Sequence, residues 1–339
     1  MFSEDRIPQG PNAIALLVGP SKKDVVDMSI LIGQIPASLD VTVVLLVVKG
    51  EGVEQQSYFR QAVAKHMKRL DIVVNPIEFT FPDGFDPAIT PPVYFFKRGK
   101  WNYHNMIRFW FRSIFLLPVF SNVEYLMRLD TDVQLPPAFW EVPNFFQFMA
   151  DRNCAYGYTS VTDDGPYVTQ GLEDHVWSYA RNHSLALQRG LAMAEHPEYM
   201  KMFFNNVELV HLPSFRQPQV QEFIETVDRS YNIYLRRWGD APLRFALASL
   251  FWNDAQVCFF PRAYGHAGLI IFPVSIEEAQ STLHVQRTRN RLTMLLSIIL
   301  LIIVIVECMR QQTDDRDLVQ AREGAEGKEG LVLVDVTVL

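Results

Sequence analysis

The chain has 339 residues, 49% of them hydrophobic, which is enough to bury a sizeable core. Its formal net charge of −7 argues against the basic surface of a nucleic-acid-binding protein. Cys154, Cys258 and Cys308 show no CxxC spacing, so neither a zinc cluster nor a thioredoxin-type pair is indicated, and at most one disulfide is expected in the globular part. This composition favours a small molecule or a glycan as the partner.

The first half of the chain predicts alternating strands and helices. Residues 1–11 are polar and lack the charged-then-apolar pattern of a signal peptide. Residues 12–19 and 41–48 are continuous apolar runs, typical of parallel strands that are covered on both faces. The expected helices are 21–39 and 59–70, and a short strand is expected at 71–74. An α/β fold with a mostly parallel sheet follows.

The second half continues this pattern after a Pro-rich loop at 81–92. Residues 103–117 predict an aromatic, mostly buried helix, and residues 125–129 predict a strand. Further helices are expected at 175–194, at 219–231 and after Asp240, where Asp240 is the expected N-cap and Pro242 lies in the first turn. No domain linker is evident before about residue 280, so residues 12–280 are expected to form one catalytic domain.

The C-terminal part changes character. Residues 292–306 are apolar and uncharged, and as a helix they span about 22 Å, short of a hydrocarbon core of about 30 Å. Extension through Met309 or snorkelling arginines would cover the difference. We therefore predict a transmembrane helix at 292–309, with a buried core helix as the alternative, and a disordered polar tail at 310–339.

An acidic pair follows the strand predicted at 125–129. Asp130 and Asp132 are two residues apart, so in extended backbone both carboxylates would point the same way at the carboxyl edge of the sheet. Open α/β sheets bind ligands at this edge. Two carboxylates suit a hard divalent cation such as Mn²⁺ or Mg²⁺. Taken alone, the pair is weak evidence for a metal site and is more typical of a solvated turn.

Four stretches of the chain form an ordered set of motifs. The most specific is Arg-Trp-Gly-Asp-Ala-Pro at 237–242, with Tyr264-Gly-His266 downstream. The other three are Tyr-His-Asn-Met-Ile-Arg-Phe at 103–109, Tyr-Leu-Met-Arg-Leu-Asp-Thr-Asp-Val at 125–133 and Phe-Asn-Asn-Val-Glu-Leu at 204–209. In this order they resemble the fungal-type α-1,2-mannosyltransferases of glycosyltransferase family 15, whose motif is identical at 237–242, similar at the other three stretches, and Tyr-Tyr-His at 264–266.

This resemblance implies a GT-A type Rossmann-like glycosyltransferase fold, with a mostly parallel central sheet flanked by helices. It also implies a retaining α-1,2-mannosyl transfer from GDP-mannose to an N- or O-linked mannosyl glycan, with Mn²⁺ as cofactor. Asp130, Asp132 and His266 would hold the metal, Glu208 matches the candidate nucleophile, and Tyr103 would line the donor site. The family's Glu-Pro-Asp is Asp-Thr-Asp here, which leaves the donor sugar open.

Several site residues keep more than one interpretation. Glu208 would either attack the anomeric carbon or stabilise its charge, unless it is a surface carboxylate. Asp240 would contact a sugar, as a base, in addition to capping its helix. Arg108 is a candidate for binding the nucleotide diphosphate, whereas for Arg112 we favour a salt bridge. Arg128 either joins the donor site or pairs with the acidic residues nearby.

Two other functions remain compatible with the sequence: a GT-A transferase of another nucleotide sugar, and a membrane-anchored glycan-binding protein without turnover. The resemblance implies a Golgi enzyme with an N-terminal anchor, but the apolar run here is C-terminal. We therefore expect a membrane protein of the Golgi or endoplasmic reticulum, with the side of its catalytic domain undecided. The Asn182-His-Ser184 sequon would suit a lumenal domain.

Overall fold

The computed structural model describes residues 6–90, 101–141, 144–192 and 198–280. All of these belong to one compact unit, Met1–Thr282. The transmembrane helix predicted at 292–309 and the tail predicted at 310–339 lie outside the described residues. Among the residues that are described, no helix is both long and apolar enough to span a bilayer.

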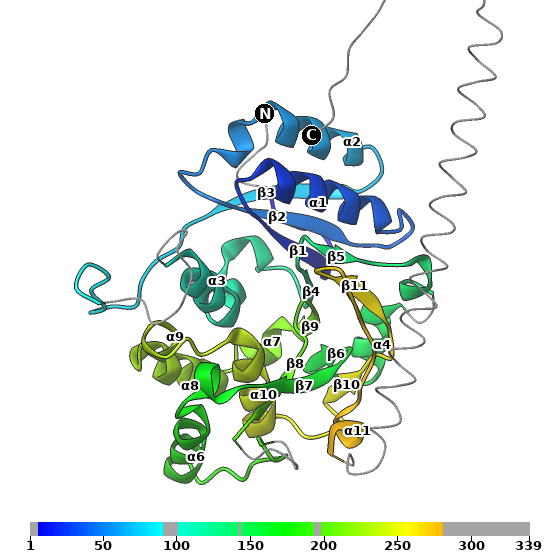
Figure 1. Cartoon of the computed structure of the whole chain (residues 1–339). Coiled ribbons are helices and arrows are strands. Elements are labelled where there is room, and N and C mark those ends of the chain that lie inside the picture. Colours follow the sequence, from blue (N-terminus) through cyan, green and yellow to red (C-terminus); the bar gives the residue numbers. More distant parts are fainter. Residues whose placement is uncertain (1–5, 91–100, 142–143, 193–197, 281–339) are drawn as a thin grey trace, which may run out of the picture. The chain divides into compact units, whose positions relative to one another are not determined.

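A seven-stranded sheet forms the centre of this unit, in the order β10-β6-β9-β4-β1-β2-β3 (Figure 1). Strand β9 runs antiparallel to its neighbours β4 and β6, and the other pairs are parallel. The mostly parallel sheet expected from the sequence is therefore confirmed. Its strands are β1 (Asn12–Val18), β2 (Thr42–Val48), β3 (Asp71–Ile77), β4 (Tyr125–Leu129), β6 (Tyr156–Tyr158), β9 (Val207–His211) and β10 (Val257–Phe259).

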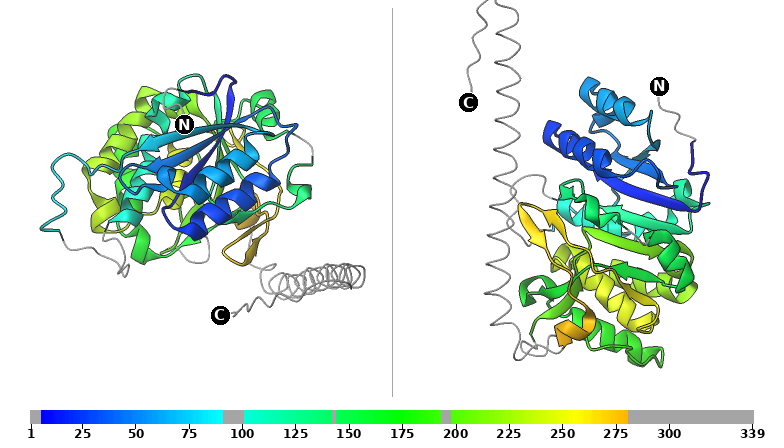
Figure 2. Two further views of the ribbon diagram at one scale, coloured as in Figure 1. Left: turned by 90° about the horizontal axis from the view of Figure 1, so that it is seen from above. Right: turned by 90° about the vertical axis from the view of Figure 1, so that its right-hand side faces the viewer.

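Both faces of the sheet are covered, which explains the unbroken apolar runs of β1 and β2. Ile14 and Leu16 belong to a core with α1 (Lys22–Gln34) and α2 (Ser57–His66), which lie side by side over one face (Figure 2). Ala13 and Ala15 belong to the core on the opposite face, with α3 (Asn102–Phe111) and α10 (Asp240–Phe251). Alternate side chains of one strand thus serve two cores.

The predicted helices are present, but four end several residues early. Helix α1 stops at Gln34 instead of 39, and α2 stops at His66 instead of 70. Helix α3 stops at Phe111 and is followed by a 3₁₀ turn at Ser113–Leu116, which ends because Pro118 restricts Leu117 to extended backbone. Helix α6 stops at Asn182 instead of continuing to 194, and Ser184 shortly after has a φ of 54°. The remaining helices are α4 (Phe145–Asp151), α5 (Pro166–Thr169), α6 (Leu172–Asn182), α7 (Leu212–Phe215), α8 (Pro218–Arg229), α9 (Asn232–Leu235) and α11 (Ile276–Gln280).

Two small sheets and a disulfide complete the unit. Strands β7 (Val161–Asp164) and β8 (Met200–Phe203) pair with each other, and β11 (Tyr264–His266) lies between β5 (Val133–Gln134) and β12 (Leu269–Ile271). Cys154 and Cys258 form the disulfide, which joins the segment before β6 to β10. This agrees with the expectation of at most one disulfide in the globular part.

Candidate active site

The site lies at the carboxyl end of β4, where Arg128 on the strand is followed by Asp130 and Asp132. Arg128 lies on β4, opposite Glu208 of the antiparallel strand β9. The backbone N–H of Asp130 donates to the carbonyl of Asn206 at 2.9 Å, so the end of β4 and the start of β9 meet at one edge. The chain then turns, because the N–H of Val133 donates to the carbonyl of Asp130 at 3.1 Å. Asp132 is therefore in a turn, and the prediction that extended backbone aligns it with Asp130 is wrong.

A cavity of about 690 Å³ opens at this edge. Its walls come from β1, α1, α3, the end of β4, the loop before β9, the start of α10 and β11. The charged residues that line it are Asp24, Asp27, Asp130, Asp132, Asp164 and Asp240 against Lys23, Arg128 and Arg237. Six carboxylates against three cations give the cavity an acidic excess, which favours a cation inside it.

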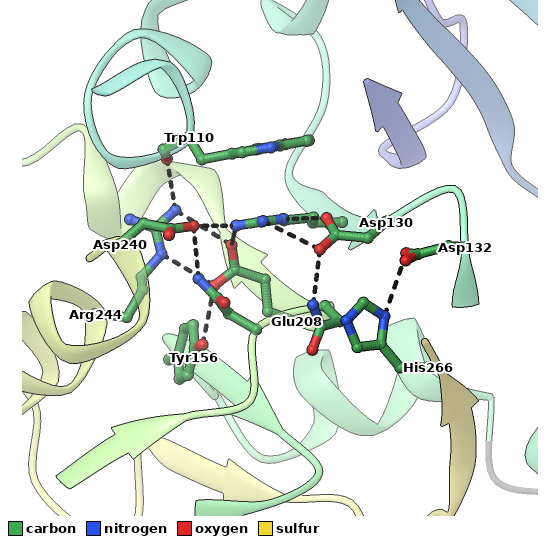
Figure 3. Close-up of polar contacts among 11 residues, drawn as sticks. Trp110, Asp130, Asp132, Tyr156, Glu208, Asp240, Arg244 and His266 are labelled. Atoms are coloured by element: carbon green, nitrogen blue, oxygen red, sulfur yellow. Dashed lines mark hydrogen bonds and ion pairs between the residues drawn. The ribbon is translucent and has the colours of Figure 1, made fainter. Parts of the chain in front are cut away.

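Asp132 and His266 face each other at one side of this cavity (Figure 3). The pairing of β11 with β5 sets His266 opposite Val133, directly after Asp132. Nδ1 of His266 is buried without a hydrogen bond, although Oδ1 of Asp132 lies 3.2 Å from it. A buried imidazole nitrogen without a hydrogen bond beside a carboxylate fits a divalent metal that accepts N and O ligands.

Asp130, the third predicted metal ligand, has other partners. Its carboxylate accepts from Nε of Arg128 at 2.9 Å and from Nδ2 of Asn206 at 2.8 Å. Burial raises its pKa, while Arg128 and Asn206 work in the opposite direction. Within the described residues, no group of three His, Cys, Asp or Glu side chains converges to hold a metal. The structure thus brings Asp132 and His266 together and turns Asp130 toward Arg128.

Asp240 and Asp130 bind different nitrogens of the Arg128 guanidinium, Nη1 and Nε respectively. Oδ2 of Asp240 accepts from Nη1 of Arg128 at 2.6 Å and from Nδ2 of Asn205 at 2.9 Å. Asp240 is itself the first residue of α10, so it does not cap the helix. The N-cap is Gly239, without a side-chain hydrogen bond, and the N-cap prediction for Asp240 was wrong.

Arg128 connects these carboxylates. Its guanidinium stacks over the ring of Trp110 at 4.4 Å, and its side chain is only 5% exposed. Burial alone would lower the pKa of Arg128, but the charges of Asp130, Asp240 and Glu208 outweigh it and raise that pKa above its usual value. The sequence left open whether Arg128 joins the cavity or pairs with acidic neighbours, and in the structure it does both.

Glu208, the predicted nucleophile, is 2% exposed and is not among the residues that line the cavity. Its carboxylate accepts from Nε of Arg244 at 3.0 Å, from Nη2 of Arg244 at 3.2 Å and from the hydroxyl of Tyr156 at 2.9 Å. Nη1 of Arg128 lies 3.7 Å away, so Glu208 lies behind Arg128 as seen from the cavity. Neither Arg244 nor Tyr156 was predicted. One signal was available for Arg244: it is the single cation in the apolar helix 243–251, which calls for a buried partner.

The two predicted residues of α3 differ in position. Tyr103 lines the cavity, and its hydroxyl accepts from Nη2 of Arg237 at 3.1 Å. Arg108 does not line it: its guanidinium donates to both carboxylate oxygens of Asp228, at 2.6 and 2.8 Å, and to Thr80. The preferred interpretation of Arg112 as a salt-bridge partner is confirmed by its 2.5 Å contact with Glu225. Arg108 is therefore not placed to bind a nucleotide in this cavity.

Comparisons with known proteins fit this arrangement. Residues 95–287 match the family model described as glycolipid 2-alpha-mannosyltransferase, which is more than half of the chain. The chain belongs to the glycolipid 2-alpha-mannosyltransferase family. One relative is the probable mannosyltransferase KTR4 of Saccharomyces cerevisiae, with 26% identity over 175 residues, 47% of this chain and 37% of the relative. The chain spans about two fifths of the length of the curated relatives it matches.

Two solved structures show the fold of this family. Core-mannan synthase A of Aspergillus fumigatus, in a form with Mn and GDP, has a TM-score of 0.65 at 19% identity, over 76% of this chain and 75% of that one. The mannosyltransferase Ktr4p of S. cerevisiae in complex with GDP has a TM-score of 0.66 at 17% identity, over 82% and 79%. The GT-A type fold expected from the sequence is confirmed.

Proposed function

We propose that this chain is a retaining, metal-assisted glycosyltransferase that moves mannose from GDP-mannose to a hydroxyl of a mannosyl glycan, in α-1,2 linkage. The observation that carries this proposal is the arrangement within one cavity of two kinds of group. Asp132 and His266 supply metal ligands at one side, and Asp240 presents a carboxylate beyond Arg128. Membership of the glycolipid 2-alpha-mannosyltransferase family supports it.

The acidic excess of the cavity supports the metal. A nucleotide diphosphate is itself anionic, so six aspartates would repel it unless a cation stood between them. Asp132 and His266 would hold that cation. Asp130, two residues before Asp132, is held beside them by its hydrogen bonds from Arg128 and Asn206. A Mn²⁺ held by Asp132 and His266 would supply the positive charge that neutralises the leaving diphosphate.

The carboxylates would have separate tasks. A bond forms between the acceptor oxygen and the anomeric carbon, and the bond from that carbon to the β-phosphate oxygen breaks. Its electron pair leaves with GDP, and the proton of the acceptor hydroxyl passes to the released β-phosphate. Either retaining route needs a carboxylate near the anomeric carbon. We assign this role to Asp240, which faces the cavity. To Glu208 we assign the holding of Arg128 and Arg244 from behind, in place of the nucleophile role.

The test is transfer from GDP-mannose to methyl α-mannoside with and without Mn²⁺, in wild type and Asp132→Ala. We expect turnover to depend on Mn²⁺ and to be lost in Asp132→Ala, while the exposed Asp151→Ala serves as the matched control. Full activity in EDTA would refute the requirement for a bound metal. Mn²⁺-dependent stabilisation by GDP without any product would favour the glycan-binding alternative.

The donor sugar needs its own experiment, because Asp130 stands where the resembling family has Glu. Hydrolysis of GDP-mannose, UDP-glucose and UDP-galactose should be compared under identical conditions. Hydrolysis of GDP-mannose alone supports the mannosyl assignment. Activity with UDP sugars only would replace it with another GT-A transferase.

For location, we propose the secretory pathway, with residues 12–280 as the catalytic domain and 292–309 as a membrane anchor. The Cys154–Cys258 disulfide supports an oxidising compartment, since cytosolic thiols are kept reduced. Asn182 of the sequon is exposed at the end of α6. A glycan on Asn182, detected as a mobility shift that glycosidase and Asn182→Gln both remove, would place this domain in the lumen.

A further inference from the structure

The cavity continues past Asp240 into a region for which the sequence suggested no role. This region is formed by Asp164 at the end of β7, Tyr167 on α5, and Arg237 with Gly239 before α10. We propose that it is a subsite for the acceptor, in which Asp164 accepts hydrogen bonds from sugar hydroxyls and the ring of Tyr167 stacks against a pyranose. This inference rests on the proposed function and names how the acceptor is recognised.

Asp164 is placed to meet a ligand beside Asp240. Oδ1 accepts from the backbone N–H of Gly165 at 3.0 Å, which fixes the carboxylate at the end of β7. A Cβ at Gly239 would lie only 3.6 Å from Oδ2, so this carboxylate packs against the residue just before Asp240. Burial raises the pKa of Asp164, and Arg237 acts against that rise. The carboxylate is therefore partly desolvated, which strengthens hydrogen bonds that it accepts.

Tyr167 provides an apolar surface at the same place. The side chain lines the cavity, yet the residue is 62% exposed. Its ring packs directly on the Cα of Gly165, where a Cβ would come within 2.4 Å of Cε1. The glycine therefore leaves room for the ring in this position. The negative face of an aromatic ring attracts the polarised C–H groups of a sugar. A tyrosine ring beside a carboxylate thus offers both the apolar and the polar contacts that a pyranose requires.

The order of charges along the cavity separates this subsite from the donor side. Asp132 and His266 lie 3.2 Å apart at the side of the proposed metal ligands. Asp164 instead packs against Gly239, next to Asp240. A donor whose diphosphate lies at Asp132 and whose sugar reaches Asp240 leaves the region of Asp164 for the second substrate.

The charge of the subsite selects a neutral ligand. Asp164 and Arg237 both line it, and each offsets the charge of the other. An anionic acceptor would meet Asp164 and Asp240 without a metal between them. A neutral, hydroxyl-rich pyranose is the class that fits.

The experiment measures acceptor and donor separately in four variants. In transfer assays, Asp164→Asn should raise the KM for methyl α-mannoside at least about tenfold, the loss expected for a hydrogen bond to a charged group. Tyr167→Ala should also raise this KM, because the ring that stacks against the pyranose is lost. The KM for GDP-mannose should change by less than about twofold. The matched control is Asp163→Asn, which keeps the cavity-lining residues intact and should behave as wild type. Tyr167→Phe keeps the ring, so its KM for methyl α-mannoside should lie closer to that of wild type than the KM of Tyr167→Ala does.

A binding readout independent of turnover distinguishes failure of the subsite from failure of the proposed function. Saturation-transfer NMR with methyl α-mannoside, in the presence of GDP and Mg²⁺, should give a signal for wild type and Asp163→Asn and none for Asp164→Asn or Tyr167→Ala. A signal that persists in these two variants, or is absent from wild type, overturns the subsite. If the wild-type protein gives a signal that Asp164→Asn loses, but shows no transfer activity, the proposed function is rejected and the subsite is retained.

Discussion

Replacing Glu208 by Gln tests whether this residue holds the site from behind or acts on the substrate. Glu208 and Arg244 are 2% and 1% exposed, and two hydrogen bonds of 3.0 and 3.2 Å join them. Removing one partner of a buried ion pair leaves an uncompensated charge and costs about 3 to 5 kcal/mol. Nη1 of Arg244 already lacks a hydrogen-bond partner, so nothing nearby would take over.

The assay is thermal unfolding by calorimetry at one fixed scan rate. For a unit of this size about 1 kcal/mol corresponds to roughly 2 to 4 °C, so Glu208→Gln should lower the Tm by roughly 6 to 20 °C. The double variant Glu208→Gln with Arg244→Met removes both charges and leaves an apolar side chain between Phe115 and Phe215. Its Tm should recover at least half of that loss, because replacing a whole buried pair is often neutral.

Two results would refute this reasoning. If Glu208→Gln unfolds within about 2 °C of wild type, the pair is not a structural support. If that variant keeps its Tm and loses turnover, Glu208 contacts the reacting sugar after all. A double variant at least as unstable as the sum of the two single variants would show that the pair is not coupled.

Three further predictions concern the cavity and its surroundings. Asp240→Asn should lower kcat by about 10² to 10⁴-fold while Mn²⁺-dependent GDP binding, measured by calorimetry, persists; an unchanged kcat would remove Asp240 from the chemistry. Asp132→Asn and His266→Gln should each weaken that GDP binding by more than about 100-fold, and Asp130→Asn by less, since a ligand matters more than its neighbours. Burial lowers the pKa of His104 to about 4, so the unfolded chain takes up this proton first as pH falls below about 6.5. The stability that His104 contributes is full above that pH, and at pH 5 this contribution should be about 2 kcal/mol less than at pH 8. In chemical denaturation, His104→Phe should reduce the difference in stability between pH 8 and pH 5 by about that amount.

Local sequence was enough to predict much of the scaffold. Strand β4 has the predicted bounds, Tyr125–Leu129, because its residues are apolar apart from Arg128 and polar residues follow at once. The apolar runs of β1 and β2 predicted parallel strands for the same reason. Strand β9 was missed, because Glu208 interrupts its apolar run and the arginine that compensates it is 36 residues away.

Tertiary partners account for what local sequence could not give. Arg108 and Arg128 both lie in motifs that resemble the family, and nothing in their immediate sequence separates them. The difference is that Asp228 of α8 engages Arg108, at a sequence distance of 120, whereas Arg128 meets Asp240 at the cavity. The partner, and not the residue type, decides which arginine is available to a substrate.

The same reasoning applies to the acidic pair Asp130 and Asp132. In extended backbone both side chains would point the same way, toward one site. Instead β4 ends at Leu129, and the hydrogen bond from Val133 N–H to the Asp130 carbonyl closes a turn between them. That turn leaves Asp130 against Arg128, whose guanidinium also binds Asp240. The same turn brings Asp132 to His266. One short motif therefore reaches both sides of the cavity. In the proposed function, its first carboxylate would order the sugar side through Arg128, and its second would hold the metal together with His266.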